Sequence, residues 1–249
     1  MPQVFFRFYA ELNDLLPAEK RQLTFAQSFK DRVTVKHLIE SLGVPHAEVD
    51  LILIDGRPVG FDHIVAEGER ISVYPVFESM DVGEVSRLRP RPLRESRFVL
   101  DTHLGQLASY LRLLGFDTLY RNDFEDPELA RISQAEKRIL LTKDRGVLKR
   151  KIVTHGYVVR ETDPARQLVE VVDRFDLRGQ FRPFTRCLRC NGLIELVDKA
   201  AVVDQLPADT RRYYDEFRRC ASCGQVYWQG SHYQRMVAFL RQTLGLKVG

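Results

Sequence analysis

Three aspartates stand beside apolar segments of the chain, where their carboxylates could do chemistry together. Asp101 directly follows the apolar run 98–100, and Asp144 follows the apolar run 139–141 with two residues between. Asp126 lies between them in sequence. Carboxylates that converge without a cation repel one another. Two or three of them, with waters and substrate phosphates, are the ligands that Mg²⁺ or Mn²⁺ takes. The three acids therefore predict a divalent-metal site that activates water for attack at phosphorus.

Each of these aspartates also has a purely structural explanation. Asp126 with Pro127 after it is a good helix N-cap with proline at the first helical position, worth about 1 kcal/mol. Asp144 begins an ordinary Asp-Arg-Gly turn sequence, and Asp101 could be paired with an arginine. The three acids taken together favour the metal site over three separate structural roles.

Four cysteines form a second candidate site in the last quarter of the chain. They occur as two Cys-x-x-Cys pairs, namely Cys187 with Cys190 and Cys220 with Cys223. Two such pairs predict a tetrahedral zinc site in which each pair supplies two thiolates. The alternative is a pair of disulfides, which a cytosolic compartment opposes. A closed set of four thiolates predicts a structural zinc ion, and His232 is not needed as a ligand.

Basic and aromatic residues surround the cysteine pairs. Together they could hold single-stranded RNA through phosphate contacts and base stacking, the latter worth about 1–3 kcal/mol per base. The alternative is that Tyr227 and Trp228 pack the small domain, which we favour for Trp228 because that domain has little other core. The residues concerned are Arg186, Arg189, Arg218, Arg219, Arg235, Tyr227, Trp228 and Tyr233.

The aspartates have to be positioned by the elements around them. From residue 97 onward, short apolar runs alternate with stretches of helical spacing, which predicts a parallel sheet with helices on its faces. In such sheets, sites form at the carboxyl ends of the strands, so Asp101 and Asp144 would emerge from the same edge. We expect strands at 97–100, 116–121, 138–142 and 156–160, and helices at 102–115, 126–137 and 164–177.

The first 78 residues have a different pattern, with strands of alternating polarity around one helix. Strands are expected at 4–9 and 23–25, and a helix at 34–42 that ends at Gly43. LILIDGRPVG then predicts a strand that leads into an Asp-Gly turn, and ERISVYPVF a last strand. This order resembles a ubiquitin-like β-grasp domain. The phrase EGERISVYPV is similar to small sulfur-carrier proteins, but those end in Gly-Gly, whereas this strand continues into FESMDVGEV.

The composition is that of an ordinary globular protein, with 44% hydrophobic and 29% charged residues. No apolar run approaches the roughly 20 residues that span a bilayer, and the N-terminus does not resemble a signal peptide, so we expect a cytoplasmic protein without membrane contact. Residues 1–78 hold 8 Lys/Arg and 12 Asp/Glu, whereas the remainder holds 30 and 22. The basic remainder favours a polyanionic partner.

A specific resemblance joins these features. The stretches FVLDTHLGQLASYLRLLGFDT and DPELARISQAEKRILLTKDRGVLKR resemble the PIN-like ribonuclease domain of the family named for the C-terminal part of the Mut-seven exonuclease. In PIN domains one Asp follows the first strand, another opens a helix, and a third lies in a Thr-x-Asp motif. The resemblance implies these roles for Asp101, Asp126 and Asp144. RCLRCNGLI and FRRCASCGQVYWQGSHY resemble the zinc ribbon that follows in this family.

Two details of the acidic positions remain. PIN domains carry a fourth acid, a Glu on an inserted helix, which has no clear match here. Asp123, Glu125 or Glu136 could substitute, although Glu136 beside Arg138 is typical of a helix surface. Phosphatases of the haloacid-dehalogenase type also place an Asp at a strand end, but they need a second Asp two residues on. His103 occupies that position, which argues against them.

We therefore predict a multidomain α/β protein: a β-grasp domain at 1–78, a basic proline-containing linker at 79–95, a PIN-like three-layer α/β domain at 96–180 and a zinc ribbon at 181–249. The predicted function is a Mg²⁺- or Mn²⁺-dependent ribonuclease. The alternatives are a non-catalytic RNA-binding or ribosome-associated adaptor, and a protein-interaction module built on the β-grasp surface. The residues expected to contact RNA are Lys143, Arg145, Arg189 and Arg219.

Overall fold

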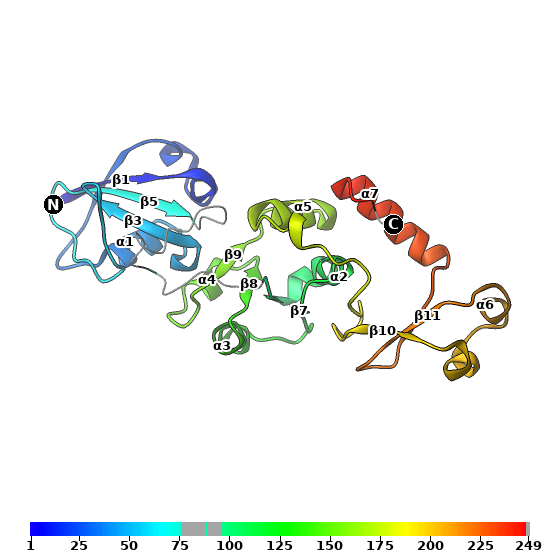
Figure 1. The fold of residues 1–249 in the computed structure, drawn as a ribbon. Coiled ribbons are helices and arrows are strands. Elements are labelled where there is room, and N and C mark those ends of the chain that lie inside the picture. Colours follow the sequence, from blue (N-terminus) through cyan, green and yellow to red (C-terminus); the bar gives the residue numbers. More distant parts are fainter. Residues whose placement is uncertain (76–87, 89–95, 248–249) are drawn as a thin grey trace. The chain divides into compact units, whose positions relative to one another are not determined.

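The computed structural model describes residues 1–75, 88 and 96–247, and these fall into two compact units (Figure 1). The first unit comprises residues 1–103 and 123–159, and the second comprises residues 104–122 and 160–249. The linker predicted at 79–95 lies outside the described residues, apart from Leu88. The predicted domain boundaries stay predictions. No helix among the described residues is long and apolar enough to cross a membrane.

The N-terminal part of the first unit is the predicted ubiquitin-like domain. Its five strands form one mixed sheet in the order β2-β1-β5-β3-β4, with β1 and β5 parallel and the other pairs antiparallel. One helix, α1, accompanies the sheet. The elements are β1 (Gln3–Phe8), β2 (Phe25–Ser28), α1 (Val35–Ser41), β3 (Val49–Ile54), β4 (Arg57–Pro58) and β5 (Arg70–Pro75).

The alternating polarity of the sequence explains this sheet. In β1, Val4, Phe6 and Phe8 are fully or almost fully buried, while the residues between them are exposed. The predicted Asp-Gly turn joins β3 to β4, and both Asp55 and Gly56 have positive φ, 49° and 80°. That backbone is the one a tight hairpin turn requires.

The second part of the first unit contains the predicted parallel sheet. Strands β6 (Phe98–Leu100), β8 (Ile139–Thr142) and β9 (Gly156–Val158) pair in parallel, and all their residues are buried. Helix α3 (Asp126–Glu136) contacts β6 and β8, and the short helix α4 (Arg145–Leu148) contacts β8 and β9. Because Leu100 pairs with Leu141, the carboxyl ends of β6 and β8 lie at one edge of the sheet.

The second unit combines helices with a small antiparallel sheet. The helices α2 and α7 are joined by stacked rings of Tyr110 and Phe239, whose centroids are 4.4 Å apart. The sheet has the order β10-β11-β12. The elements are α2 (Gly105–Leu113), β7 (Thr118–Leu119), α5 (Pro164–Arg174), β10 (Ile194–Val197), α6 (Ala208–Tyr213), β11 (Phe217–Cys220), β12 (Val226–Tyr227) and α7 (Ser231–Leu244).

Short 3₁₀ helices complete the described chain: η1 (Ala10–Leu15), η2 (Ala18–Lys20), η3 (His46–Glu48), η4 (Thr102–Leu104), η5 (Arg178–Gln180), η6 (Lys199–Ala201) and η7 (Val203–Gln205). The predicted strand at 116–121 shortens to the two residues of β7. Helix α7 was not predicted, although Met236, Leu240 and Leu244 have helical spacing and Gly245 ends it in the left-handed conformation, φ 68°. The fold is thus the predicted α/β class, with its four cysteines near the C-terminus as in a zinc ribbon.

Candidate functional site

Asp101 is a buried carboxylate at the carboxyl end of β6. The residue is 5% exposed, and its amide donates to the carbonyl of Leu141 on β8 (3.1 Å). Its Oδ1 accepts a hydrogen bond from the amide of His103 (2.8 Å), and its Oδ2 accepts from the amide of Lys143 (2.7 Å) and from the hydroxyl of Thr142. Three donors therefore hold one carboxylate, which fixes its orientation.

The hydroxyl of Thr142 links two of the predicted acidic positions. Thr142 is fully buried at the end of β8. It donates to the Asp101 carboxylate and accepts a hydrogen bond from the amide of Asp144 (2.8 Å). The Thr-x-Asp motif thus sets the backbone that carries Asp144 relative to the side chain of Asp101. The two aspartates emerge at the same sheet edge, as the parallel pairing of β6 and β8 predicted.

Asp144 is exposed and caps the helix that follows it. Its Oδ1 accepts from the amide of Gly146 (2.7 Å), and Asp144 is the N-cap residue of α4. Asp126 is exposed in the first turn of α3. The alternative of Asp126 as N-cap is wrong in this structure, because Glu125 occupies that position and makes no side-chain cap hydrogen bond. An acid in the first turn still interacts favourably with the helix dipole.

The three acids do not form one compact ligand group. In the part of the chain that the structure describes, the four cysteines are the group of three or more Asp, Glu, His or Cys residues that could hold a metal ion. Among the other acids weighed above, Glu136 accepts from the Nε of Arg138 (2.7 Å) on the surface end of α3. That pairing is the helix-surface role expected of Glu136.

The two predicted basic residues beside Asp144 are placed differently. Lys143 donates its amide to Asp101, so its backbone is part of the acidic site. The guanidinium of Arg145 donates from Nη1 to the carbonyl of Leu15 in the ubiquitin-like domain (2.9 Å). This contact has no local sequence signal, because 130 residues separate its partners.

The four cysteines converge as the two Cys-x-x-Cys pairs predicted. Their ligand atoms all lie within 4.8 Å of one another, with Sγ–Sγ distances of 3.6 Å for Cys187 and Cys223 and 3.4 Å for Cys190 and Cys220. Four thiolates about 2.3 Å from a tetrahedral ion would be about 3.8 Å apart. All four are free cysteines, so the disulfide alternative is wrong. The arrangement could bind a metal such as zinc.

Burial and backbone hydrogen bonds shift the pKa values of two of these thiols in opposite directions. Burial acts to raise the pKa of Cys220, but hydrogen bonds from the amides of Cys223 and Ser222 outweigh it and lower the pKa to about 7. A thiolate is the form that binds metal. Burial raises the pKa of Cys190 to about 12. The hydroxyl of Tyr227 lies 3.0 Å from Sγ of Cys187, a contact with no local sequence signal.

The remaining predicted residues surround this centre. Arg189 and Arg219 are exposed. The guanidinium of Arg186 donates to the carbonyls of Gly115 (3.3 Å) and Asn191 (2.9 Å), so it braces the chain around the first cysteine pair. Trp228 packs against the small core of the ribbon, which is the structural role favoured for it. That core contains Val202, Leu206, Phe217 and Val226.

Comparisons with known proteins bear out the resemblance. Residues 96–240 match the family model described as the Mut7-C RNAse domain, and residues 1–81 match Mut7-C ubiquitin. Among curated proteins no match was found. The crystal structure of small archaeal modifier protein 1 from H. volcanii matches 31% of this chain and 100% of its own chain, at 15% identity and a TM-score of 0.26. This chain belongs to the Mut7-C RNAse domain family and carries a Mut7-C ubiquitin-like domain at its N-terminus.

Proposed function

We propose that this protein is a divalent-metal-dependent ribonuclease that hydrolyses RNA phosphodiester bonds. One observation carries the proposal: the buried carboxylate of Asp101 is joined through the hydroxyl of Thr142 to the backbone of Asp144 at one sheet edge. Burying a carboxylate is costly unless hydrogen bonds compensate it, and here three donors do so and hold it in place. Its place at the carboxyl ends of parallel strands, in a chain of a ribonuclease family, supports a catalytic use.

Asp101 and Asp144, with Asp126, are the residues that would hold Mg²⁺ or Mn²⁺. Oxygen donors suit these hard ions. Mg²⁺ usually keeps several waters and takes only one or two carboxylates together with substrate phosphates. A compact three-carboxylate group is therefore not required. The bound ion would polarise the phosphoryl oxygen and activate water.

The other residues of the site would position the acids or attract the phosphate, without contacting the attacking water. The hydroxyl of Thr142 would hold the Asp101 carboxylate and the Asp144 backbone in a fixed relative position. Lys143 directly precedes Asp144 in sequence and donates its backbone amide to the Asp101 carboxylate. Its positive charge would attract the phosphate. Arg145, whose guanidinium contacts Leu15, would contribute its charge from the edge of the site.

The C-terminal ribbon would bind zinc and RNA. We propose zinc because four cysteine thiolates are a common ligand set for this ion. Since they leave no coordination position open, the site would be structural and not catalytic. The exposed Arg189 and Arg219 would contact phosphates beside it.

The competing proposal is a non-catalytic RNA-binding or ribosome-associated adaptor. The acids' failure to form a compact group favours it. In that case the ribbon would bind RNA while Asp101 and Asp144 would only stabilise the sheet edge. A protein partner of the ubiquitin-like domain fits either proposal.

A cleavage assay separates the two proposals. Labelled RNA is incubated with the full-length protein and Mn²⁺, and wild type is compared with Asp144→Asn. Asn keeps the side-chain oxygen that caps α4 but removes the charge, so the fold is retained. We expect cleavage to fall by at least about 100-fold. The control Asp209→Asn removes an exposed carboxylate from α6 and should cleave like wild type. Equal cleavage by wild type and Asp144→Asn, or RNA binding without cleavage in both, would refute the ribonuclease proposal.

A further inference from the structure

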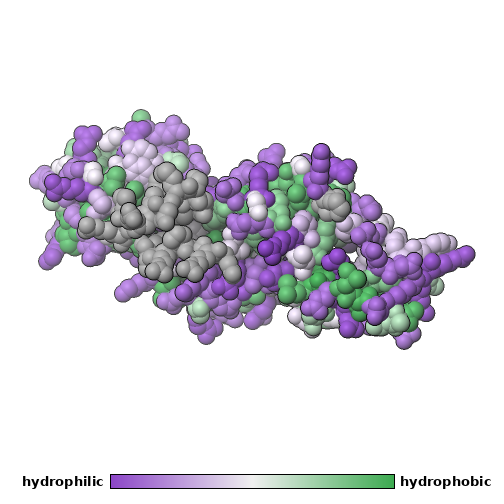
Figure 2. All heavy atoms as spheres, viewed as in Figure 1, coloured by the Kyte–Doolittle hydropathy of each residue, from purple (hydrophilic) through white to green (hydrophobic). Residues whose placement is uncertain are grey.

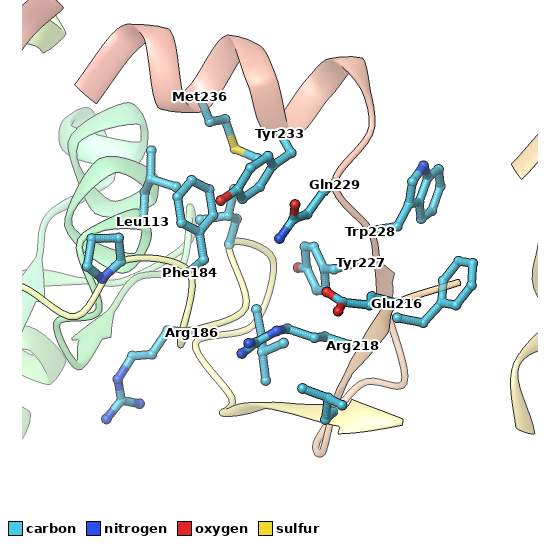
Figure 3. A pocket seen from close by; sticks show the side chains of 15 residues that line it. Leu113, Phe184, Arg186, Glu216, Arg218, Tyr227, Trp228, Gln229, Tyr233 and Met236 are labelled. Carbon is cyan, nitrogen blue, oxygen red and sulfur yellow. The ribbon is translucent and has the colours of Figure 1, made fainter. Parts of the chain in front are cut away.

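A pocket in the second unit lies between the small sheet and the first turns of α7. Its volume is about 210 Å³, smaller than the roughly 300–1,000 Å³ of pockets for drug-sized ligands. Figure 3 shows Phe184, Tyr227 and Tyr233 around it, with Arg218 from β11 below them. Every residue that lines the pocket belongs to the second unit. A space of this size suits one flat ring system.

One row of residues across the small sheet lines the pocket. Residues directly opposite one another on neighbouring antiparallel strands point to the same face. Arg218 lies opposite both Leu196 on β10 and Tyr227 on β12, so these three form a row on the pocket side. Phe217, the next residue along β11, belongs to the buried core of the ribbon and also borders the pocket. Trp228 packs on that core and also borders the pocket.

The helix supplies the opposite wall. Tyr233 and Met236 are three residues apart on α7 and therefore share one face. The ring of Tyr233 packs on that of Phe184, with centroids 4.5 Å apart. The far end of α7 is anchored by Phe239, which stacks on Tyr110. The aromatic wall is thus held in place by packing outside the pocket.

The charge of the ribbon indicates what kind of ligand the pocket would bind. Residues 181–249 contain eleven Lys/Arg against six Asp/Glu, which favours an anionic ligand. Arg218 is exposed on the rim of the pocket. Glu216 and Gln229 also line it and offer an acceptor and a donor to the edge of a base. Figure 2 shows hydrophobic residues gathered on the surface near β10, and Leu196 there is 73% exposed.

We propose that this pocket binds one nucleotide of single-stranded RNA, with the base packed against Tyr233 and Tyr227 and the neighbouring phosphate on Arg218. The inference rests on the proposed function, because it takes RNA as the substrate. It adds a site for a nucleotide away from the acids. Aromatic rings that stack on a base beside a cation that contacts phosphate are the elements of single-strand recognition.

Binding of a short labelled single-stranded RNA, followed by fluorescence anisotropy without added Mg²⁺ or Mn²⁺, tests the pocket. Tyr233→Leu keeps apolar packing but removes the ring, and should weaken binding at least about fivefold. Arg218→Gln should weaken binding and lower the slope of log K against log salt by about 0.7. Tyr213 and Arg212 form a matched pair elsewhere in the unit, with the guanidinium carbon 5.4 Å from the ring centroid. Tyr213→Leu and Arg212→Gln should bind within about twofold of wild type.

The outcomes separate this inference from the proposed function. If Tyr233→Leu and Arg218→Gln bind RNA as wild type does, the pocket is not a nucleotide site, even if cleavage persists. If wild type binds an apolar peptide in the same assay but no RNA, the inference is also overturned. Loss of cleavage in Asp144→Asn with normal RNA binding leaves the pocket supported. Arg218 is exposed, so Arg218→Gln reports on binding even if Tyr233→Leu unfolds.

Discussion

The hydroxyl of Thr142 should be the most sensitive single group of the acidic site. Thr142→Val replaces it with a methyl group of similar volume, so the buried packing at the end of β8 changes little. Two hydrogen bonds are lost: one donated to the Asp101 carboxylate and one accepted from the amide of Asp144. The carboxylate retains the amides of His103 and Lys143 as donors.

The expected cost follows from these two contacts. A hydrogen bond to a charged group contributes about 1.5–3 kcal/mol, and one between neutral groups about 0.5–1.5 kcal/mol. Because Asp144 is exposed, water can replace its partner in part. We therefore expect Thr142→Val to lower the free energy of unfolding by about 2–3 kcal/mol. Cleavage should fall about 10- to 100-fold, the usual effect of removing a group that orients a metal ligand.

The assay pairs urea denaturation with RNA cleavage in the presence of Mn²⁺. Thr118→Val is the matched control, because Thr118 is equally buried and its hydroxyl donates to the carbonyl of Phe116 (3.1 Å). Its loss removes one neutral hydrogen bond, about 0.5–1.5 kcal/mol, and should leave cleavage unchanged.

Two results would refute the reasoning on Thr142. A loss no larger than that of Thr118→Val would mean that the carboxylate contact contributes nothing beyond an ordinary hydroxyl. A stability loss of the expected size with wild-type cleavage would mean that the bridge only stabilises the sheet edge. The second result would favour the adaptor over the ribonuclease.

Three further predictions concern the rest of the chain. Elemental analysis should find one zinc per chain, and chelation should unfold the ribbon as monitored by circular dichroism, whereas a folded metal-free ribbon would contradict the zinc site. Glu48→Ala should cost about 1–3 kcal/mol by urea denaturation, because the Glu48 carboxylate is 1% exposed and accepts from the amide of Val158 (2.8 Å), whereas exposed Glu19→Ala should change little. Burial, with the positive charge of Lys36, lowers the pKa of His46 from 6.5. As the pH falls, His46 is therefore protonated in the unfolded state before it is protonated in the folded state. The free energy of unfolding should decrease as the pH drops below 6.5, and His46→Gln should reduce this pH dependence.

Local sequence patterns were sufficient for most elements of the first unit and for the cysteine cluster. Asp101 stands at the end of a short apolar run, and such a run in a chain of alternating strands and helices indicates a buried parallel strand. The two Cys-x-x-Cys pairs were enough to predict that the four cysteines come together, because this spacing is typical of a metal site. The Asp-Gly turn at 55–56 could be predicted from those two residues alone. In each case the information lies within a few positions of the chain.

Other features depended on residues far apart in sequence. Helix α7 at 231–244 was not predicted, although Leu240 and Leu244 have helical spacing and are buried. No local pattern could show that the Arg145 guanidinium meets Leu15, or that Tyr233 packs on Phe184. Periodicity specifies which face of an element is apolar, but not which distant element covers it. By itself the sequence determined most strands of the first unit, the positions of the acids and the cysteine pairs. Only the tertiary structure decided that a threonine hydroxyl joins Asp101 to Asp144 and that aromatic rings enclose a pocket, because both depend on contacts between elements that sequence spacing does not encode.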